Sequence, residues 1–434
     1  MRTVLAVFLI GCGGNTVTPD ATEPLAPTAN LAREIVDTDL AFDVSAKTGT
    51  AVITFGASTE PGATVEVGDL ALATVSVDGV EIQFAIAEGE GSGPGPGKIA
   101  NLGLPASDQP LPVTFTYAYL KHGSFDGAAD TFTFTWPYFC GNLFPCHSDP
   151  DDGTTFTLDL AGIPAGKTAL FPTSIVEAPS YQVAWAIGDF TETTLGTTGA
   201  GTQVSLFHTA AEQTQANQGG ANLVAVFDWL ETHIGPYRFG TKVSGVSIAW
   251  PAGAFGGMEH HPMWHVAKSS FKSEETQAHE ASHGWYGDGI RIACWEDFVL
   301  SEGTVTYLAG RALEEVAPAV GATVWQGYAS ELAGIAGGDP VWPEGCNEID
   351  ILEDNLYTNA PYIRGAFFYR GVADKVGAVK LDEALAAFYA EHDGKAATMT
   401  DMLATIQTVT GYDATACATS WLRSPTKPAP GPCP

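Results

Sequence analysis

Two histidines and a glutamate between residues 279 and 283 have the types and spacing of a metal-dependent hydrolytic site. The segment reads His-Glu-Ala-Ser-His, so His279 and His283 leave the same face of a helix, one turn apart. Glu280 lies beside them, where its carboxylate can take a proton from an attacking water. The pattern predicts metal-assisted hydrolysis. The alternative is an amphipathic helix that carries two ordinary histidines.

Two helices must position these groups together with a third ligand. Ser273 is predicted to cap the first helix, because acidic residues follow it directly and favour a helix amino terminus. Asp297 is predicted to cap the second helix, from which Glu302 would point inward. Three protein ligands leave the fourth position of a tetrahedral zinc open for water. The expected ligands of one zinc ion (Zn2+) are His279, His283 and Glu302.

The surroundings of this motif resemble the M1 family of zinc aminopeptidases. Trp285 follows His283 by two positions, as in the H-E-x-x-H-x-W motif of that family. Residues 295–303 read Trp-Glu-Asp-Phe-Val-Leu-Ser-Glu-Gly and are similar to the family's W-x-D-x-x-L-N-E-G, whose Glu is the third zinc ligand. Ser301 replaces the usual Asn, which leaves the ligand in place. The resemblance implies a zinc peptidase with Glu280 as its general base.

A second resemblance lies upstream, at residues 251–260. They read Pro-Ala-Gly-Ala-Phe-Gly-Gly-Met-Glu-His and resemble the G-x-M-E-N edge strand that lines the substrate cleft of the family, with His260 in place of Asn. Glu259 would pair with the substrate's α-ammonium, and a solvated loop carboxylate is the alternative. His261 and His265 are interpreted as structural or cleft-wall residues, because the zinc already has three ligands. The substrate-binding residues implied by the resemblance are Gly256, Gly257, Met258 and Glu259.

Residues 360–365 read Ala-Pro-Tyr-Ile-Arg-Gly and resemble the family's Y-x-K-G, with Arg364 in place of Lys. The resemblance implies that Tyr362 donates a hydrogen bond to the oxyanion of the reaction, and a core aromatic is the alternative. One part of the amine site differs. In the family a Gln or Glu shortly before the Cys of an F-P-C motif helps to hold the free amine, but the matching residues 134–136 read Phe-Thr-Trp.

The pattern of elements predicts a multidomain α+β protein. Residues 31–195 show short alternating strands with frequent turns, such as residues 75–84 around Asp78-Gly79, and are expected to form an all-β saddle or sandwich. Residues 144–150 resemble a sequence motif of the family's amino-terminal domain. Residues 181–190 resemble the final strand of that domain. From residue 196 to 424 helical patterns dominate, and the resemblance implies a thermolysin-like α/β catalytic domain. Residues 425–434 are expected to be a tail, in a short form without the family's helical carboxy-terminal domain.

The amino terminus and the cysteines favour an exported protein. Residues 1–12 read as a signal peptide that ends in a segment similar to a bacterial lipobox, with Cys12 as the lipidated residue and 13–30 as a linker. A buried strand is the alternative. The expected location is the outer membrane or cell surface. The six other cysteines allow fifteen pairings, among which sequence proximity suggests Cys140–Cys146 and Cys417–Cys433 and leaves Cys294–Cys346.

The composition excludes some classes of binding partner. The 434 residues include 19 basic and 50 acidic side chains, and the net charge of −31 argues against nucleic acid and against a basic membrane-binding face. Contact with a membrane is therefore expected only through the lipid anchor. Peptides are the expected substrates, and an aminopeptidase is the function that the motifs favour. A zinc endopeptidase or oligopeptidase of the same fold is one alternative, and a catalytically silent surface-binding protein is another.

Overall fold

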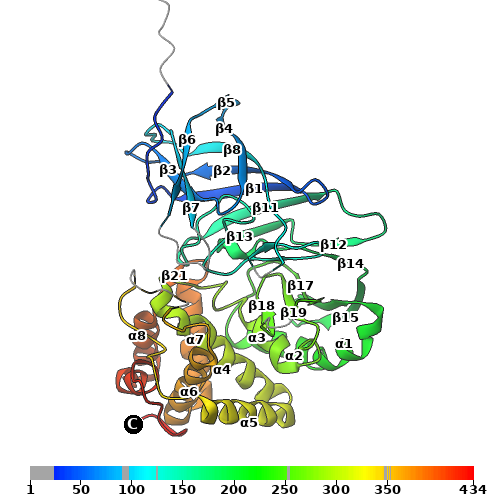
Figure 1. Ribbon diagram of the computed structural model, residues 1–434. Helices are drawn as coiled ribbons and strands as arrows, with labels where there is room; N and C mark the ends of the chain where they lie inside the picture. Colours follow the sequence, from blue (N-terminus) through cyan, green and yellow to red (C-terminus); the bar gives the residue numbers. More distant parts are fainter. Residues whose placement is uncertain are drawn as a thin grey trace, which may run out of the picture.

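The structure is a computed structural model that describes residues 24–89, 97–123, 126–251, 255–346, 349, 351 and 353–434 (Figure 1). The predicted signal peptide with Cys12, and residues 13–23 of the predicted linker, lie outside these ranges. None of the helices in the described ranges has the length and apolarity that a bilayer crossing requires.

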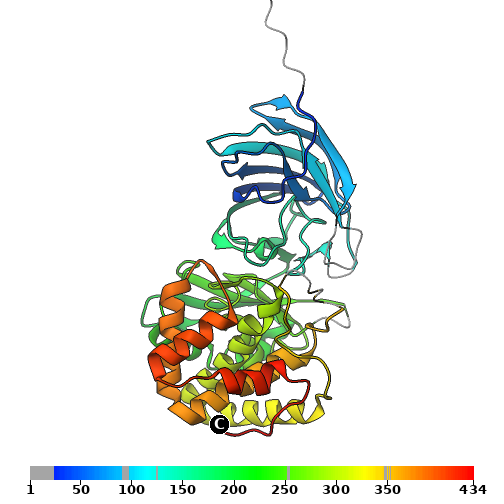
Figure 2. The same cartoon turned by 90° about the vertical axis from the view of Figure 1, so that its left-hand side faces the viewer.

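The amino-terminal part consists of β-sheets, which form a separate layer above the helical part (Figure 2). Its strands alternate between buried and partly exposed residues, as in β2, where Ala51, Ile53 and Phe55 are fully buried. Within the described ranges, the largest sheet has the order β13 (Ser174–Ala178), β11 (Thr154–Ala161), β1 (Ile35–Asp43), β2 (Thr48–Phe55), β8 (Leu111–Ala118), β4 (Ala71–Val77) and β5 (Val80–Glu81). A smaller sheet contains β3 (Ala63–Glu66), β7 (Lys98–Leu102) and β6 (Phe84–Glu88).

Two expected strand features differ in the structure. The turn at Asp78-Gly79 is present with positive φ at both residues, but β5 ends at Glu81, and Phe84 begins β6 in another sheet. Residues 181–187 do not form one strand, because Pro179 precedes a 3₁₀ turn at Ser180–Gln182 and only β14 (Ala186–Gly188) is extended. Short pairs complete this part: β9 (Gly127–Ala128) with β10 (Thr133–Phe134), and β12 (Thr168–Leu170) with β14.

A mixed five-stranded sheet lies next to the segment with His279 and His283. Its order is β15 (Thr191–Thr197), β16 (Gln203–His208), β17 (Lys242–Ile248), β19 (Met263–Ala267) and β18 (Gly257–Met258). The expected domain boundary at residue 195 falls inside β15, which pairs with β16. The short strand β18 lies at the edge, antiparallel to β19, as expected for a strand that lines a cleft. One more pair, β20 (Arg291–Ile292) with β21 (Ala396–Ala397), lies outside this sheet.

The helices pack beside and below this sheet around an apolar core (Figures 1 and 2). The described α-helices are α1 (Gln213–Gly219), α2 (Leu223–His233), α3 (Glu274–Ser282), α4 (Phe298–Val316), α5 (Pro318–Gly334), α6 (Asn359–Val376), α7 (Ala378–His392), α8 (Met399–Thr410) and α9 (Thr415–Ala418). Helices α4 and α6 cross at two glycines, because a Cβ atom on Gly303 would lie 2.8 Å from the Cα atom of Gly365. This close crossing sets the distance between Glu302 on α4 and Tyr362 on α6.

Three disulfides join the described cysteines: Cys140–Cys146, Cys294–Cys346 and Cys417–Cys433. The pairing suggested by sequence proximity is therefore confirmed. Cys294–Cys346 ties the segment before α4 to the long connection between α5 and α6, so it restrains two elements that border the catalytic residues.

Candidate active site

Helix α3 presents both histidines of the motif to one cavity. Ser273 caps it as predicted, because its side chain accepts a hydrogen bond from the Thr276 backbone nitrogen at 3.1 Å. His279 lies in the last turn, and His283 follows as the C-cap with helical backbone angles. The two side chains therefore keep the one-face arrangement that their spacing predicted.

The prediction that Asp297 caps the helix that follows it is wrong. Asp297 directly precedes α4, but its φ and ψ of −87° and 16° are not extended, because the 3₁₀ turn Trp295–Asp297 runs straight into the helix. Its side chain makes no cap bond to α4. Asp297 Oδ1 instead accepts a hydrogen bond from the Met399 backbone nitrogen at 2.8 Å, at the start of α8. The carboxylate thus caps a helix far away in sequence.

Three ligand atoms meet with the spacing of a tetrahedral site. The Nε2 atoms of His279 and His283 lie 3.3 Å apart, and Glu302 Oε2 lies 3.2 Å from the first and 3.4 Å from the second. Zinc–nitrogen bonds of about 2.0–2.1 Å in a tetrahedron place neighbouring ligand atoms about 3.3–3.4 Å apart. Glu302 Oε2 is buried and accepts no well-aligned hydrogen bond from any described residue. A shared zinc ion fits these three atoms.

Hydrogen bonds on the far side of each ring support this fit. His283 Nδ1 lies 3.1 Å from the carbonyl oxygen of Tyr286, so it donates there. Thr306 donates its hydroxyl proton to the Glu302 carbonyl at 2.7 Å, which leaves its oxygen to accept from His279 Nδ1 at 3.4 Å. When both rings are neutral, the two Nε2 atoms then turn lone pairs toward each other, an arrangement that a cation between them stabilises.

Charges in the cavity also attract a cation. Burial alone would raise the pKa of the Glu302 carboxyl, but His283 and His279 outweigh burial and lower this pKa to about 2. Burial alone would lower the pKa of His283, but the Glu259 and Glu302 carboxylates raise it well above its usual value. Glu302 is therefore an anionic group in a site that favours positive charge.

Glu280 lies on α3 directly against the edge strand. A Cβ atom on Gly257 would collide with the Glu280 carboxylate, so a glycine is needed at this point of β18. Ligand atoms of Glu280, Glu259 and His283 all lie within 4.8 Å of one another. Burial, with the Glu259 and Glu302 carboxylates, raises the pKa of Glu280 well above its usual value, although His283 opposes this. A carboxylate of raised pKa is suited to proton transfer.

Tyr181 and Asp288, whose role no sequence motif indicated, hold Glu259 in place. The Tyr181 hydroxyl lies 2.8 Å from Glu259 Oε1 and 2.8 Å from Asp288 Oδ1. The hydroxyl has one proton, so it donates to one carboxyl group and can accept only from a protonated form of the other. Burial raises the pKa of Asp288 well above its usual value, and the Glu259 charge adds to this. A raised pKa favours the protonated form of Asp288, and in that form the Tyr181 hydroxyl donates to Glu259.

The nearby histidines have structural contacts. His261 is fully buried, with Nδ1 2.7 Å from the Tyr237 hydroxyl and Nε2 2.8 Å from the Glu280 carbonyl oxygen. His260 and His265 pack edge to face with ring centroids 4.8 Å apart. Burial lowers the pKa of His261 and of His265 to about 3, so both rings are neutral. These histidine rings are part of the packing that supports β18.

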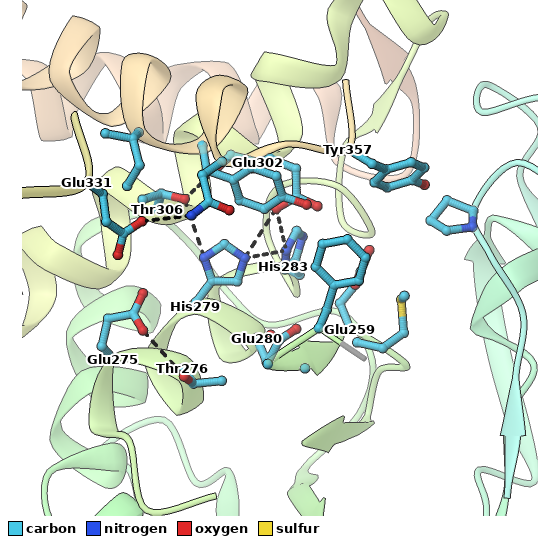
Figure 3. Close-up of a pocket in the computed structure, with 18 of the residues that line it drawn as sticks. Glu259, Glu275, Thr276, His279, Glu280, His283, Glu302, Thr306, Glu331 and Tyr357 are labelled. Carbon is cyan, nitrogen blue, oxygen red and sulfur yellow. Dashed lines mark hydrogen bonds and ion pairs between the residues drawn. The ribbon is translucent and has the colours of Figure 1, made fainter. Parts of the chain in front are cut away.

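The cavity between β18, α3, α4 and α6 has a volume of about 170 Å³ (Figure 3). Tyr362 lines it and stacks over the His279 ring at 5.9 Å. Burial raises the pKa of Tyr362 well above its usual value, so its hydroxyl stays a hydrogen-bond donor. The structure brings all of the sequence-predicted site residues to this cavity: Gly256, Gly257, Met258, Glu259, His279, Glu280, His283, Glu302 and Tyr362.

Phe134 and Trp136, which stand where the family has a Gln or Glu that binds the amine, lie in different surroundings. Phe134 is fully buried and packs against Trp136 and Trp250, whereas Trp136 lines the cavity. Further lining residues had no motif to reveal them: Phe255, Glu275, Tyr328, Glu331, Tyr357 and Asn359. The two acidic residues lie at the end of the cavity away from Glu259 (Figure 3).

Comparison with known proteins finds similarity to one peptidase family. Residues 236–421 match the model of the peptidase family M1 domain. Leucine aminopeptidase 2 of Aspergillus niger is 27% identical over 309 residues, which cover 63% of this chain and 48% of that protein. The protein of the same name from Emericella nidulans is 25% identical and covers 61% and 46%. The chain thus spans about half the length of these curated relatives.

Solved structures share the fold along nearly the whole chain. The M1 zinc metallopeptidase from Deinococcus radiodurans superimposes with a TM-score of 0.74 at 19% identity, covering 92% of this chain and 96% of that one. Aminopeptidase A of Legionella pneumophila, in complex with aspartic acid, gives a TM-score of 0.74 at 17% identity, covering 93% and 51%. The expected architecture, an amino-terminal β part followed by a mixed α and β part, is confirmed.

Proposed function

We propose that this chain is a zinc aminopeptidase of the peptidase family M1, because residues 236–421 match the model of that family's domain. Its substrates are peptides with a free amino terminus, from which it releases one residue at a time. One zinc ion is held by His279, His283 and Glu302.

The position of Glu259 carries this proposal. Its carboxylate lies within 4.8 Å of Glu280 and His283, so an amine bound to it is close to the reacting groups. In a peptide, the α-nitrogen and the carbonyl carbon of one residue are about 2.5 Å apart, and each further residue adds about 3.3–3.6 Å. Only one residue fits between the anchor and the reacting carbonyl. This geometry favours removal of single amino-terminal residues.

The other residues have separate roles. When bound, zinc polarises the scissile carbonyl and lowers the pKa of a water molecule. Glu280 accepts the proton of the attacking water and passes it to the leaving amine. Tyr362 donates its hydroxyl hydrogen bond to the developing oxyanion. The backbone of Gly256, Gly257 and Met258 lies along the substrate at the edge of the sheet.

Product analysis tests the proposal. The zinc-loaded protein is incubated with unblocked peptides of eight to ten residues, and the products are followed in time by mass spectrometry. We expect a ladder that loses one amino-terminal residue at each step, which a chelator stops. Internal fragments would favour the endopeptidase alternative. The absence of a Gln or Glu at residues 134–136 is an argument for that alternative. No cleavage would favour a binding protein.

Tyr181 is expected to act on substrate binding through Glu259. Tyr181→Phe removes the hydrogen bond to Oε1 and frees that carboxylate to rotate. We expect KM for unblocked peptides to rise by roughly two- to twelvefold, from a hydrogen bond worth about 0.5–1.5 kcal/mol, with kcat changed less. Steady-state kinetics separate the two constants. An equal loss on amino-terminally acetylated peptides would instead mean a general structural defect.

We also propose that the protein is exported and anchored by a lipid on Cys12. The apolar residues 4–10 and the following Gly-Cys support this, and three disulfides suit an oxidising compartment. Cys12→Ser is expected to release the protein from the membrane fraction and to abolish labelling with a palmitate analogue. Fractionation with unchanged membrane association would contradict the anchor.

A further inference from the structure

Resting on the proposed aminopeptidase function, we propose that this enzyme selects peptides whose first residue is large and apolar, above all aromatic. The selecting surface consists of Trp136, Phe255 and Tyr357, here named the aromatic wall. It would contact the side chain of the residue that is released.

The aromatic wall brings together three segments that are far apart in sequence. The ring centroids of Trp136 and Phe255 lie 5.5 Å apart, those of Trp136 and Tyr357 5.3 Å, and those of Phe255 and Tyr357 6.1 Å. All three side chains line the catalytic cavity. Such distances are typical of aromatic pairs in direct contact, so the rings form one continuous apolar surface.

Further aromatic rings support this surface from behind. Tyr138 is buried and stacks on Trp136 with a centroid distance of 5.8 Å. Phe298 is buried and meets Tyr357 edge to face at 5.3 Å. Because these supporting rings are packed in the core, Trp136 and Tyr357 are held in place before a substrate binds, and Phe255 packs against both of them. A preformed apolar surface binds an apolar side chain without an ordering cost.

The aromatic wall lies on the amine side of the cavity. Met258 precedes Glu259 directly, and Pro137, next to Trp136, lines a small adjoining cavity together with Glu259. Figure 3 shows Tyr357 on the same side as Glu259, whereas Glu275, Thr276 and Glu331 lie on the opposite side. An ammonium nitrogen within hydrogen-bonding distance of Glu259 places the first Cα about 4 Å from that carboxylate. The side chain that leaves this atom is the one that can reach the aromatic wall.

The chemistry of the surface decides which side chain it takes. Phe255 is 36% exposed, so an apolar group that covers it removes apolar area from water. A short side chain such as that of Ala covers little of this area. An acidic first residue would approach the carboxylates Glu259 and Glu280. Differences in apolar contact within such a pocket change kcat/KM by about 10- to 200-fold.

The test compares tripeptides X-Ala-Ala that differ only in the first residue X, with X as Phe, Trp, Leu, Ala or Glu. For the wild-type protein we expect kcat/KM for Phe and Trp to exceed that for Ala by at least about tenfold. Phe255→Ala and Trp136→Ala should reduce this ratio by about three- to tenfold, mainly through the aromatic substrates. Because Phe255 is partly exposed, its replacement leaves the core packing in place. Leu120→Ala is the control, since Leu120 is 57% exposed in the β part and the ratio should not change.

A flat profile across X in the wild-type protein, or equal losses on Phe and Ala peptides in both variants, would overturn the proposal. Failure of the proposed function itself would look different, because the first residue X would then not be released from any of the tripeptides. In that case the affinities of the protein for Phe amide and Ala amide, measured by calorimetry, test the aromatic wall. Binding of Phe amide at least about tenfold tighter, lost in Phe255→Ala, supports the aromatic wall, and equal affinities contradict it.

Discussion

Glu280→Gln is expected to lower kcat by about 10²–10⁴-fold on every peptide that the protein cleaves. The amide keeps the size of the side chain but cannot accept the proton of the attacking water. Glu280 is not one of the three converging ligand atoms, so the metal site should survive. Steady-state rates with unblocked and acetylated peptides measure the loss. Metal analysis should still find zinc in the variant.

A smaller loss in Glu280→Gln, below about tenfold, would exclude Glu280 as the base. A loss confined to unblocked peptides would also contradict its role, because the proton transfer does not depend on the amino terminus. Loss of zinc in the same variant would mean that Glu280 helps to hold the ion.

Glu302→Ala is expected to abolish both zinc binding and activity. The change removes the only anionic ligand of the three and leaves two imidazoles that face each other at 3.3 Å. Removal of a ligand is more harmful than loss of a supporting contact, which typically costs 10–100-fold in metal affinity. Metal analysis should give one zinc per wild-type chain and none in the dialysed variant. Glu314→Ala is the control, because Glu314 lies on the same helix and pairs with Arg370 at the surface.

Retention of zinc and activity in Glu302→Ala would show that another carboxylate is the third ligand. Among the described residues Glu259 and Glu280 are the alternatives, since each lies within 4.8 Å of a His283 ligand atom. Two zinc ions per wild-type chain would contradict the single site.

The parts of the site that depend on helix geometry could be predicted from the sequence. His279, Glu280 and His283 lie within one helix and its cap, so their relative positions follow from spacing alone. Glu302 joins them because α4, the next α-helix along the chain, packs against α3. The edge strand β18 was also expected, from the resemblance of residues 256–260 to the strand that lines the family's substrate cleft. The contact of Gly257 with Glu280 was not expected and comes from the structure.

The parts that depend on distant contacts could not be predicted. Tyr181 and Glu259 are 78 positions apart, and no local pattern joins a residue of the β part to the edge strand. Asp297 satisfies the cap rule in composition, but its hydrogen bond goes to Met399, 102 positions away. The pattern at residues 181–187 favoured a strand, but the 3₁₀ turn after Pro179 directs Tyr181 toward Glu259 and Asp288.

The central claim, that Glu259 makes this enzyme an aminopeptidase, is tested most directly by one comparison. The values of kcat/KM are measured for one peptide with a free and with an acetylated amino terminus, in the wild-type protein and in Glu259→Ala. We expect Glu259→Ala to lower kcat/KM on the free peptide by about 1.5–3 kcal/mol, roughly 10- to 150-fold, the range of a hydrogen bond to a charged group. The acetylated peptide should be cleaved slowly and equally by both proteins. Equal losses on the two peptides would show that Glu259 does not bind the amine, and would contradict the account.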